Sequence, residues 1–305
     1  MRAIYLGDVV LQRRKSLDLT QEMVCEGLCS TMTLSRFEGN KQTPSRDLVT
    51  AILQRLGLPD DQYYAHLTRK ETKLVRLRKE IRAYCNQFEH TTGEERQQIC
   101  TYALEKLQSL ERCVKENDCI NQQFILMARV TLDLYPLQNQ LEMLMKSIRL
   151  TSPRFNLDEL DTCLYHENEI LGINQIAIRY ALCEQFGKAF DIFGQLLTLV
   201  QKRTPNHSSL PLITYNYALY LASEGRLEEA LKISGIGQKS CIAQGYYEMF
   251  PKLLHIDAGC YYILGESDKS LNLFRSAYHI YGVTRDVRSQ QISAANVKGC
   301  FNLTL

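Results

Sequence analysis

The sequence has 305 residues, 45% of them apolar, and a formal net charge of only +2. This length allows two or three domains, and this apolar content argues against widespread disorder. No apolar run reaches the roughly 18 residues of a membrane span, and no signal-peptide pattern opens the sequence, so we expect a cytoplasmic protein. Its eleven cysteines are then expected to be reduced thiols, because disulfides persist mainly in oxidising compartments.

The small net charge hides an uneven distribution along the chain. Residues 1–82 carry 15 Lys and Arg against 10 Asp and Glu, a net charge of +5. The remainder carries 21 against 24, a net charge of −3. A basic N-terminal part is compatible with nucleic-acid binding, although an imbalance of this size supports that interpretation without proving it.

The N-terminal pattern predicts several short helices. Apolar residues recur at helical spacing over residues 6–17. A second helix is expected after Thr20, which has a side chain suited to an N-cap, with Val24 and Leu28 on one apolar face. A third helix is expected over about 31–38. Two short helices joined by a tight turn form a helix-turn-helix, whose second helix enters the major groove of DNA.

Polar side chains at the start of these two helices are the candidate contacts to DNA. The candidate DNA-binding residues are Thr20, Gln21, Thr31, Met32, Thr33, Arg36 and Lys41. Hydroxyl and guanidinium groups can hydrogen-bond both phosphates and base edges. We assign Thr20 and Gln21 to phosphates, and the start of the 31–38 helix to bases.

This segment resembles the phage-repressor-like (XRE) helix-turn-helix family. The resemblance rests on Thr20–Gln21, the run Leu34–Glu38, Gly39, Pro44 and Ser45. The turn is one residue shorter than the commonest family spacing, and Cys29 stands where that family usually has glycine. The resemblance implies that Arg14 and Glu38 pair as a structural clamp. The alternative is a helical bundle that binds no nucleic acid.

Two further helices, over 46–57 and about 60–67, would complete a DNA-binding domain at residues 1–67. Residues 68–90 are predicted to form a connecting helix. Its first part, 69–82, holds seven basic and two acidic residues. This charge indicates either a solvated face or contact with DNA phosphate beside the operator.

The region from 91 to 305 is expected to be a series of helical repeats. Three segments are similar at a spacing of about 40 residues, a period that is typical of TPR-like helical repeats: 180–193, 217–234 and 260–274. Helices expected over 94–113, 118–133 and 137–149 fit earlier, degenerate repeats. The sequence therefore predicts an all-α fold, with a TPR-like solenoid after the helix-turn-helix bundle.

Small residues mark the expected contact between the two helices of each repeat. Ala189, Ala230 and Ser270 align in the three segments and suit a close crossing of helices. Gly225 and Gly265 lie five residues before the last two of them, at the turn between helices, where the first segment instead has Glu184.

The concave face of such a solenoid is the candidate ligand site. Asn174 and Asn216 lie 42 residues apart, at nearly equivalent repeat positions. A carboxamide both donates and accepts, so a ladder of asparagines can hold the main chain of an extended peptide. Arg129, Lys252 and His255 are added as candidates because a basic group would suit a peptide carboxylate. The alternative is that each asparagine packs against its own neighbouring helix.

The order of helix-turn-helix and TPR-like repeats resembles the RRNPP family of peptide pheromone receptors from Gram-positive bacteria. The best local matches are residues 19–45, 174–193 and 215–231. This resemblance implies a cytoplasmic homodimeric regulator of transcription that binds operator DNA and a short signalling peptide, with residues 91–305 binding the peptide and forming the dimer. The repeats are degenerate, and no groove residue besides the two asparagines matches.

Catalytic and metal-binding motifs are absent from the sequence. It contains no G-x-G-x-x-G, P-loop, G-x-S-x-G or H-E-x-x-H pattern and no C-x-x-C, so we expect no enzyme, no metal and no cofactor. Two alternatives to a peptide receptor remain. One is a TPR-like protein that sequesters a protein partner, and the other is a helix-turn-helix repressor controlled by a non-peptide ligand.

Overall fold

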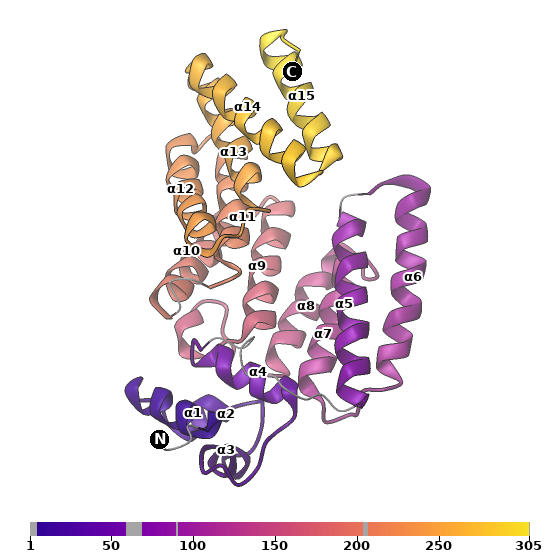
Figure 1. Cartoon of the computed structure of the whole chain (residues 1–305), viewed down its shortest axis with the longest axis vertical. Helices are drawn as coiled ribbons and strands as arrows, with labels where there is room; N and C mark the ends of the chain where they lie inside the picture. Colours follow the sequence, from indigo (N-terminus) through magenta and orange to yellow (C-terminus); the bar gives the residue numbers. More distant parts are fainter. Residues whose placement is uncertain (1–4, 59–68, 90, 204–206, 305) are drawn as a thin grey trace. The chain divides into compact units, whose positions relative to one another are not determined.

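The computed structural model describes residues 5–58, 69–89, 91–203 and 207–304. Within these ranges it contains fifteen α-helices and no strand (Figure 1), which confirms the predicted all-α class. The helix expected at 60–67, and the domain boundary expected at 67, lie outside the described residues. None of the described helices combines the length and apolar character that a membrane crossing requires.

The chain divides into two compact units, Met1–Arg179 and Tyr180–Leu305. The first unit begins with a bundle of four helices: α1 (Leu6–Ser16), α2 (Gln21–Cys25), α3 (Thr31–Glu38) and α4 (Arg46–Arg55). The centre of this bundle consists of the fully buried Val10, Val24, Leu34 and Ile52, together with Phe37. The predicted helix-turn-helix therefore lies on a continuous apolar core.

The turn between α2 and α3 is longer than predicted. Thr20 caps α2 as expected, since its hydroxyl accepts a hydrogen bond from the Met23 amide at 3.2 Å. However, α2 ends at Cys25, so Leu28 lies in the turn rather than on a helical face, and it still packs against the bundle core. Gly27, with φ of 68°, adopts the left-handed conformation that ends α2 early.

The clamp between Arg14 and Glu38 is present. The guanidinium donates from Nε to Oε1 at 2.6 Å and from Nη2 to Oε2 at 2.8 Å. Both residues are buried, and the hydrogen bond to Glu38 raises the pKa of Arg14. Gln21 donates from Nε2 to the same carboxylate at 2.7 Å, so α1, α2 and α3 meet at one buried charge.

The rest of the first unit consists of helical hairpins. Its further helices are α5 (Arg69–Glu89), α6 (Gly93–Glu111), α7 (Cys119–Thr131) and α8 (Leu137–Arg149), followed by α9 (Glu167–Leu182), whose last residues enter the second unit. The helix expected to be a connector, α5, pairs with α6 as two long neighbouring helices (Figure 1) and also packs against α7. Leu77 and Ile81 of α5 are buried in this core.

The second unit repeats one hairpin design. It contains α10 (Phe186–Arg203), α11 (Leu210–Ser223), α12 (Leu227–Gln244), α13 (Phe250–Ile263), α14 (Ser267–Thr284) and α15 (Val287–Phe301). Each of these helices packs against the next, and α11 also packs against α13, as the first helices of stacked repeats do. Ala189, Ala230 and Ser270 are fully buried, and the Ser270 hydroxyl donates to the Ala258 carbonyl at 2.7 Å across the α13–α14 hairpin. This contact supports the close crossing predicted from small residues.

The turns of the three repeats share one backbone conformation. Gly225 and Gly265 have φ of 73° and 80°, and Glu184 has φ of 58° at the corresponding position. A residue with a Cβ is strained by roughly 1–2 kcal/mol in this region. The repeat therefore requires a left-handed residue at this turn even where the sequence supplies no glycine.

We expect Glu38→Ala to lower the free energy of unfolding of the N-terminal bundle by about 3–5 kcal/mol, because it leaves Arg14 buried without its partner. The matched control is Glu22→Ala, which removes an exposed carboxylate from α2. Denaturant unfolding followed by circular dichroism gives both values. Equal midpoints for the two variants would contradict a structural role for the pair.

Candidate functional site

The helix α3 exposes one face of the bundle while its other face is buried. Thr31, Met32 and Arg36 are exposed, with Met32 at 62%, whereas Leu34 and Phe37 lie in the core. Thr33 is half-buried, and its hydroxyl is 2.9 Å from that of Ser30, the N-cap of α3. The exposed face thus carries hydroxyl, thioether and guanidinium groups on a rigid helix, and it suits the reading of DNA bases.

The other DNA-binding candidates differ in how far they are exposed. Thr20 and Lys41 are exposed, whereas Gln21 is half-buried. The amide nitrogen of Gln21 is engaged by Glu38 in the buried clamp. Any contact of Gln21 with a phosphate would therefore have to coexist with this structural hydrogen bond.

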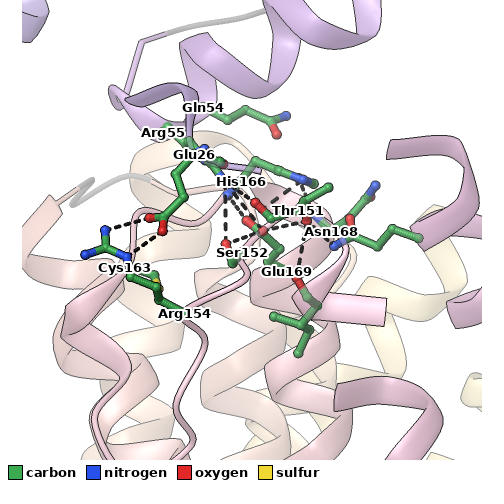
Figure 2. Close-up of polar contacts among 12 residues, drawn as sticks. Glu26, Gln54, Arg55, Thr151, Ser152, Arg154, Cys163, His166, Asn168 and Glu169 are labelled. Carbon is green, nitrogen blue, oxygen red and sulfur yellow. Dashed lines mark hydrogen bonds and ion pairs between the residues drawn. The ribbon is translucent and has the colours of Figure 1, made fainter. Parts of the chain in front are cut away.

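A buried arginine attaches the bundle to the remainder of the first unit. Arg55, the last residue of α4, donates from Nη1 to the carbonyls of Val24 and Glu26 at 2.9 and 2.7 Å. Its Nη2 donates to the Thr151 carbonyl at 2.8 Å, directly after α8 (Figure 2). One guanidinium thus joins the end of α2 to the end of α8.

The charge of Arg55 is balanced by a second buried group. Glu169 of α9 lies 3.7 Å from Nη2, and both side chains are almost fully buried. Its carboxylate accepts hydrogen bonds from the hydroxyls of Thr151 and Ser152 at 2.6 and 2.5 Å, and from the His166 amide at 2.7 Å (Figure 2). Desolvation lowers the pKa of Arg55, and burial lowers the pKa of His166, which favours a neutral imidazole beside the charged pair.

The helix-turn-helix turn itself takes part in the attachment. A Cβ atom at Gly27 would lie 2.0 Å from the Thr151 carbonyl oxygen, so no side chain fits there. Next to it, Glu26 and Arg154 form a two-pronged ion pair at 2.5 and 2.6 Å (Figure 2). The turn therefore contacts the segment after α8 directly.

The two asparagines predicted to hold a peptide are not displayed on the surface. Asn174 is fully buried in α9, and Asn216 is 9% exposed in α11. The fully buried Ala177, Ala218 and Ala258 lie 41 and 40 residues apart and define the repeat register. The spacing of 42 between the asparagines is one residue longer, which corresponds to a rotation of roughly 100° around a helix. They are therefore neighbouring rather than equivalent positions.

The basic candidates provide less free positive charge than their residue types suggest. Arg129 pairs with Glu111 at 2.5 Å, and both line a cavity of about 410 Å³ between the end of α6, α7 and α8. His255 is half-buried, its Nε2 contacts the Ser293 hydroxyl, and burial lowers its pKa to about 4. It is consequently uncharged at neutral pH, contrary to the expected basic role. Lys252 is half-buried on α13.

Sequence reasoning missed the attachment formed by Arg55, Glu169, Thr151 and Gly27. Arg55 ends an apolar helix, at a position where an arginine ordinarily lies on the surface. Its partners lie between 29 and 114 residues away in the sequence, so no local spacing identifies them. The glycine in an otherwise unremarkable turn was the one available signal, since it indicates a close approach of backbone.

The comparisons with known proteins identify the fold. No protein-family model matches the sequence, and no curated protein matches it. Among solved structures, the chain is similar to Bacillus thuringiensis PlcR in complex with the peptide PapR7 and DNA, with a TM-score of 0.55 and 18% identity over 99% of this chain and 100% of that one. Bacillus thuringiensis PlcR in its apo form gives a TM-score of 0.54 and 16% identity, over 95% of this chain and 99% of that one.

The apo form of the competence regulator ComR from Streptococcus vestibularis gives a TM-score of 0.52 and 14% identity, over 97% of both chains. Identities this low establish a shared fold and no more. The resemblance expected from the sequence, to peptide-responsive regulators with a helix-turn-helix and TPR-like repeats, is confirmed at the level of the fold.

We expect Arg55→Met to destabilise the first unit by about 3–5 kcal/mol, because Glu169 would remain charged and buried without its partner. Hydrogen exchange should accelerate at residues 24–28 and 151–153, where the lost hydrogen bonds lie. Arg112→Met, at an exposed residue after α6, serves as the control. Unchanged exchange in both segments would show that the bundle is held without Arg55.

Proposed function

We propose that this chain is a cytoplasmic transcriptional regulator whose DNA binding is controlled by a short signalling peptide. The observation that carries the proposal is the shared fold over nearly the whole chain with PlcR, which has been seen with a peptide and DNA bound. The exposed polar face of α3 supports the DNA-binding part independently.

The DNA-binding role rests on how α3 is held. Leu34, Phe37 and Glu38 fix the inner face of this helix, so Thr31, Met32 and Arg36 project from a rigid support. A single reading helix contacts too few bases for operator-level affinity. The protein therefore acts as a homodimer on a pseudo-palindromic site, with one bundle on each half-site.

Arg36→Ala should weaken binding to the operator by about 1–3 kcal/mol and relax specificity at one base pair, if the guanidinium holds a base through two hydrogen bonds. Arg275→Ala removes an equally exposed guanidinium from α14 and controls for the lost charge. Fluorescence anisotropy with DNA from upstream of the protein's own gene measures both variants. A footprint of one half-site, saturating with the mass of a monomer, would contradict the dimer.

The peptide-binding role concerns the first helices of the repeats. Asn174 and Asn216 are the carboxamides that can pair with a peptide main chain, and both are buried in this structure. Binding therefore requires their side chains to turn outward or the helices to shift around them. A ligand that binds one arrangement of the repeats better than another shifts their balance, and this difference in affinity is what changes DNA binding.

Asn174→Ala and Asn216→Ala should each weaken peptide binding about three- to tenfold, which is the value of one or two hydrogen bonds between neutral groups. Suitable ligands are synthetic peptides of roughly five to ten residues from small reading frames beside the gene. Calorimetry with the full chain measures affinity, and thermal melts separate lost binding from lost stability. Asn139→Ala, at an exposed position of α8, is the control.

Two outcomes of this experiment would redirect the proposal. If both asparagine variants bound the cognate peptide as the parent does, the peptide would bind elsewhere on the repeats. If no peptide bound and a protein partner did, the chain would be a sequestering protein instead.

A further inference from the structure

A second candidate ligand site lies where the bundle meets the other helices of the first unit. A cavity of about 350 Å³ opens between α4, α5, the start of α7 and the start of α9. Small-molecule sites typically enclose roughly 300–1,000 Å³, so this cavity has room for a small metabolite and not for a folded segment. None of the candidate DNA-binding or peptide-binding residues named above lines it, while Arg78, Lys79 and Arg82 come from the basic segment 69–82.

The lining of the cavity carries an excess of positive charge. Its four basic side chains are Arg46, Arg78, Lys79 and Arg82, against the acidic Asp47 and Glu167. His166 also lines it, and burial lowers the pKa of this imidazole.

The two acidic groups do not neutralise this excess. Asp47 accepts two side-chain hydrogen bonds. Arg78 donates from Nη2 to Oδ1 at 2.6 Å, and the Asn121 carboxamide donates from Nδ2 to Oδ2 at 3.1 Å. Arg82 donates to a neutral group, the Asn168 carboxamide oxygen, at 3.3 Å. Desolvation and the proximity of Arg78 lower the pKa of Arg82, against the opposing effect of Glu167. An anion next to Arg82 would relieve the repulsion between the two guanidinium groups.

The remainder of the lining selects the kind of anion. Thr50, Gln54 and Asn168 present hydroxyl and carboxamide groups, and the apolar contribution is limited to Ala51, Val75 and Ile120. None of the described lining residues is Phe, Tyr or Trp, and His166 is the one ring among them. Guanidinium groups match the geometry of phosphate oxygens, and the polar groups match hydroxyls.

We propose that this cavity binds a small phosphorylated metabolite with a hydroxyl-rich body, such as a sugar phosphate. Arg82 and Lys79 hold the phosphate, and Thr50, Gln54 and Asn168 bond the hydroxyls. The ligand contacts α4 of the bundle together with α5 and α9, so its binding stabilises the attachment of the bundle. The regulator thereby responds to a metabolite in addition to the proposed peptide.

The test is calorimetry of the full chain, in a buffer free of phosphate and sulfate, with ribose 5-phosphate, pyrophosphate and ribose. Ribose 5-phosphate should bind with a Kd below about 1 mM, pyrophosphate more weakly, and ribose not detectably. Arg82→Gln and Lys79→Gln should each weaken binding about tenfold or more, as the loss of a charge-assisted hydrogen bond does.

Two control variants separate a built site from general attraction of anions. Arg76→Gln makes the same change at another exposed residue of α5, which lies outside the cavity lining, so binding should be unchanged. Arg36→Gln removes a charge from the proposed DNA-binding face and should also leave binding unchanged. The proposal is overturned if neither phosphate compound binds at about 10 mM, or if either control weakens binding as much as Arg82→Gln does.

Discussion

The placement of the N-terminal bundle depends on one buried guanidinium. Arg55 donates to three main-chain carbonyls, two at the end of α2 and one after α8, and its contacts with Val24 and Thr151 are buried. A charge at this depth is stable only because Glu169 faces it and is itself bonded by two hydroxyls and an amide. The interaction is therefore cooperative, and removing any member leaves the others with buried, unsatisfied groups.

A second buried charged pair links helices within the bundle, as Arg55 and Glu169 link the bundle to the rest of its unit. Arg14 and Glu38 hold α3 against α1, and Gln21 ties α2 to them. The two contacts act in series, since Arg14–Glu38 fixes α3 within the bundle and Arg55 with its partners fixes the bundle within its unit. Arg14 holds the Glu38 carboxylate through two parallel hydrogen bonds, whereas Arg55 divides its donors among three main-chain carbonyls. The orientation of the exposed face of α3 thus depends on polar contacts as much as on the apolar core.

Local patterns in the sequence were enough for most of the helices and for the repeat, whereas the pairing of Arg14 with Glu38 was expected from the family resemblance. Thr20 signalled a helix start, and the spacing of Ala189, Ala230 and Ser270 signalled the hairpin crossings, because capping and close packing depend on neighbours along the chain. The contact between Arg55 and Glu169 spans more than a hundred residues and uses residue types that ordinarily lie on surfaces, so no periodicity identifies it. The burial of Asn174 and Asn216 could not be predicted in the same way, since a difference of one residue in register turns a side chain by roughly 100° around its helix.

Because Gly27 has no side chain, it limits which helix-turn-helix bundles could replace this one. In domain shuffling, a helix-turn-helix bundle is exchanged as a module that a linker joins to the next domain. Here the turn inside the module leaves space for the Thr151 carbonyl, so a donor bundle with any other residue at that position would collide with its new host. A chimera that replaces this bundle therefore has to keep a glycine in the turn or to transfer the turn together with the segment after α8 that receives it.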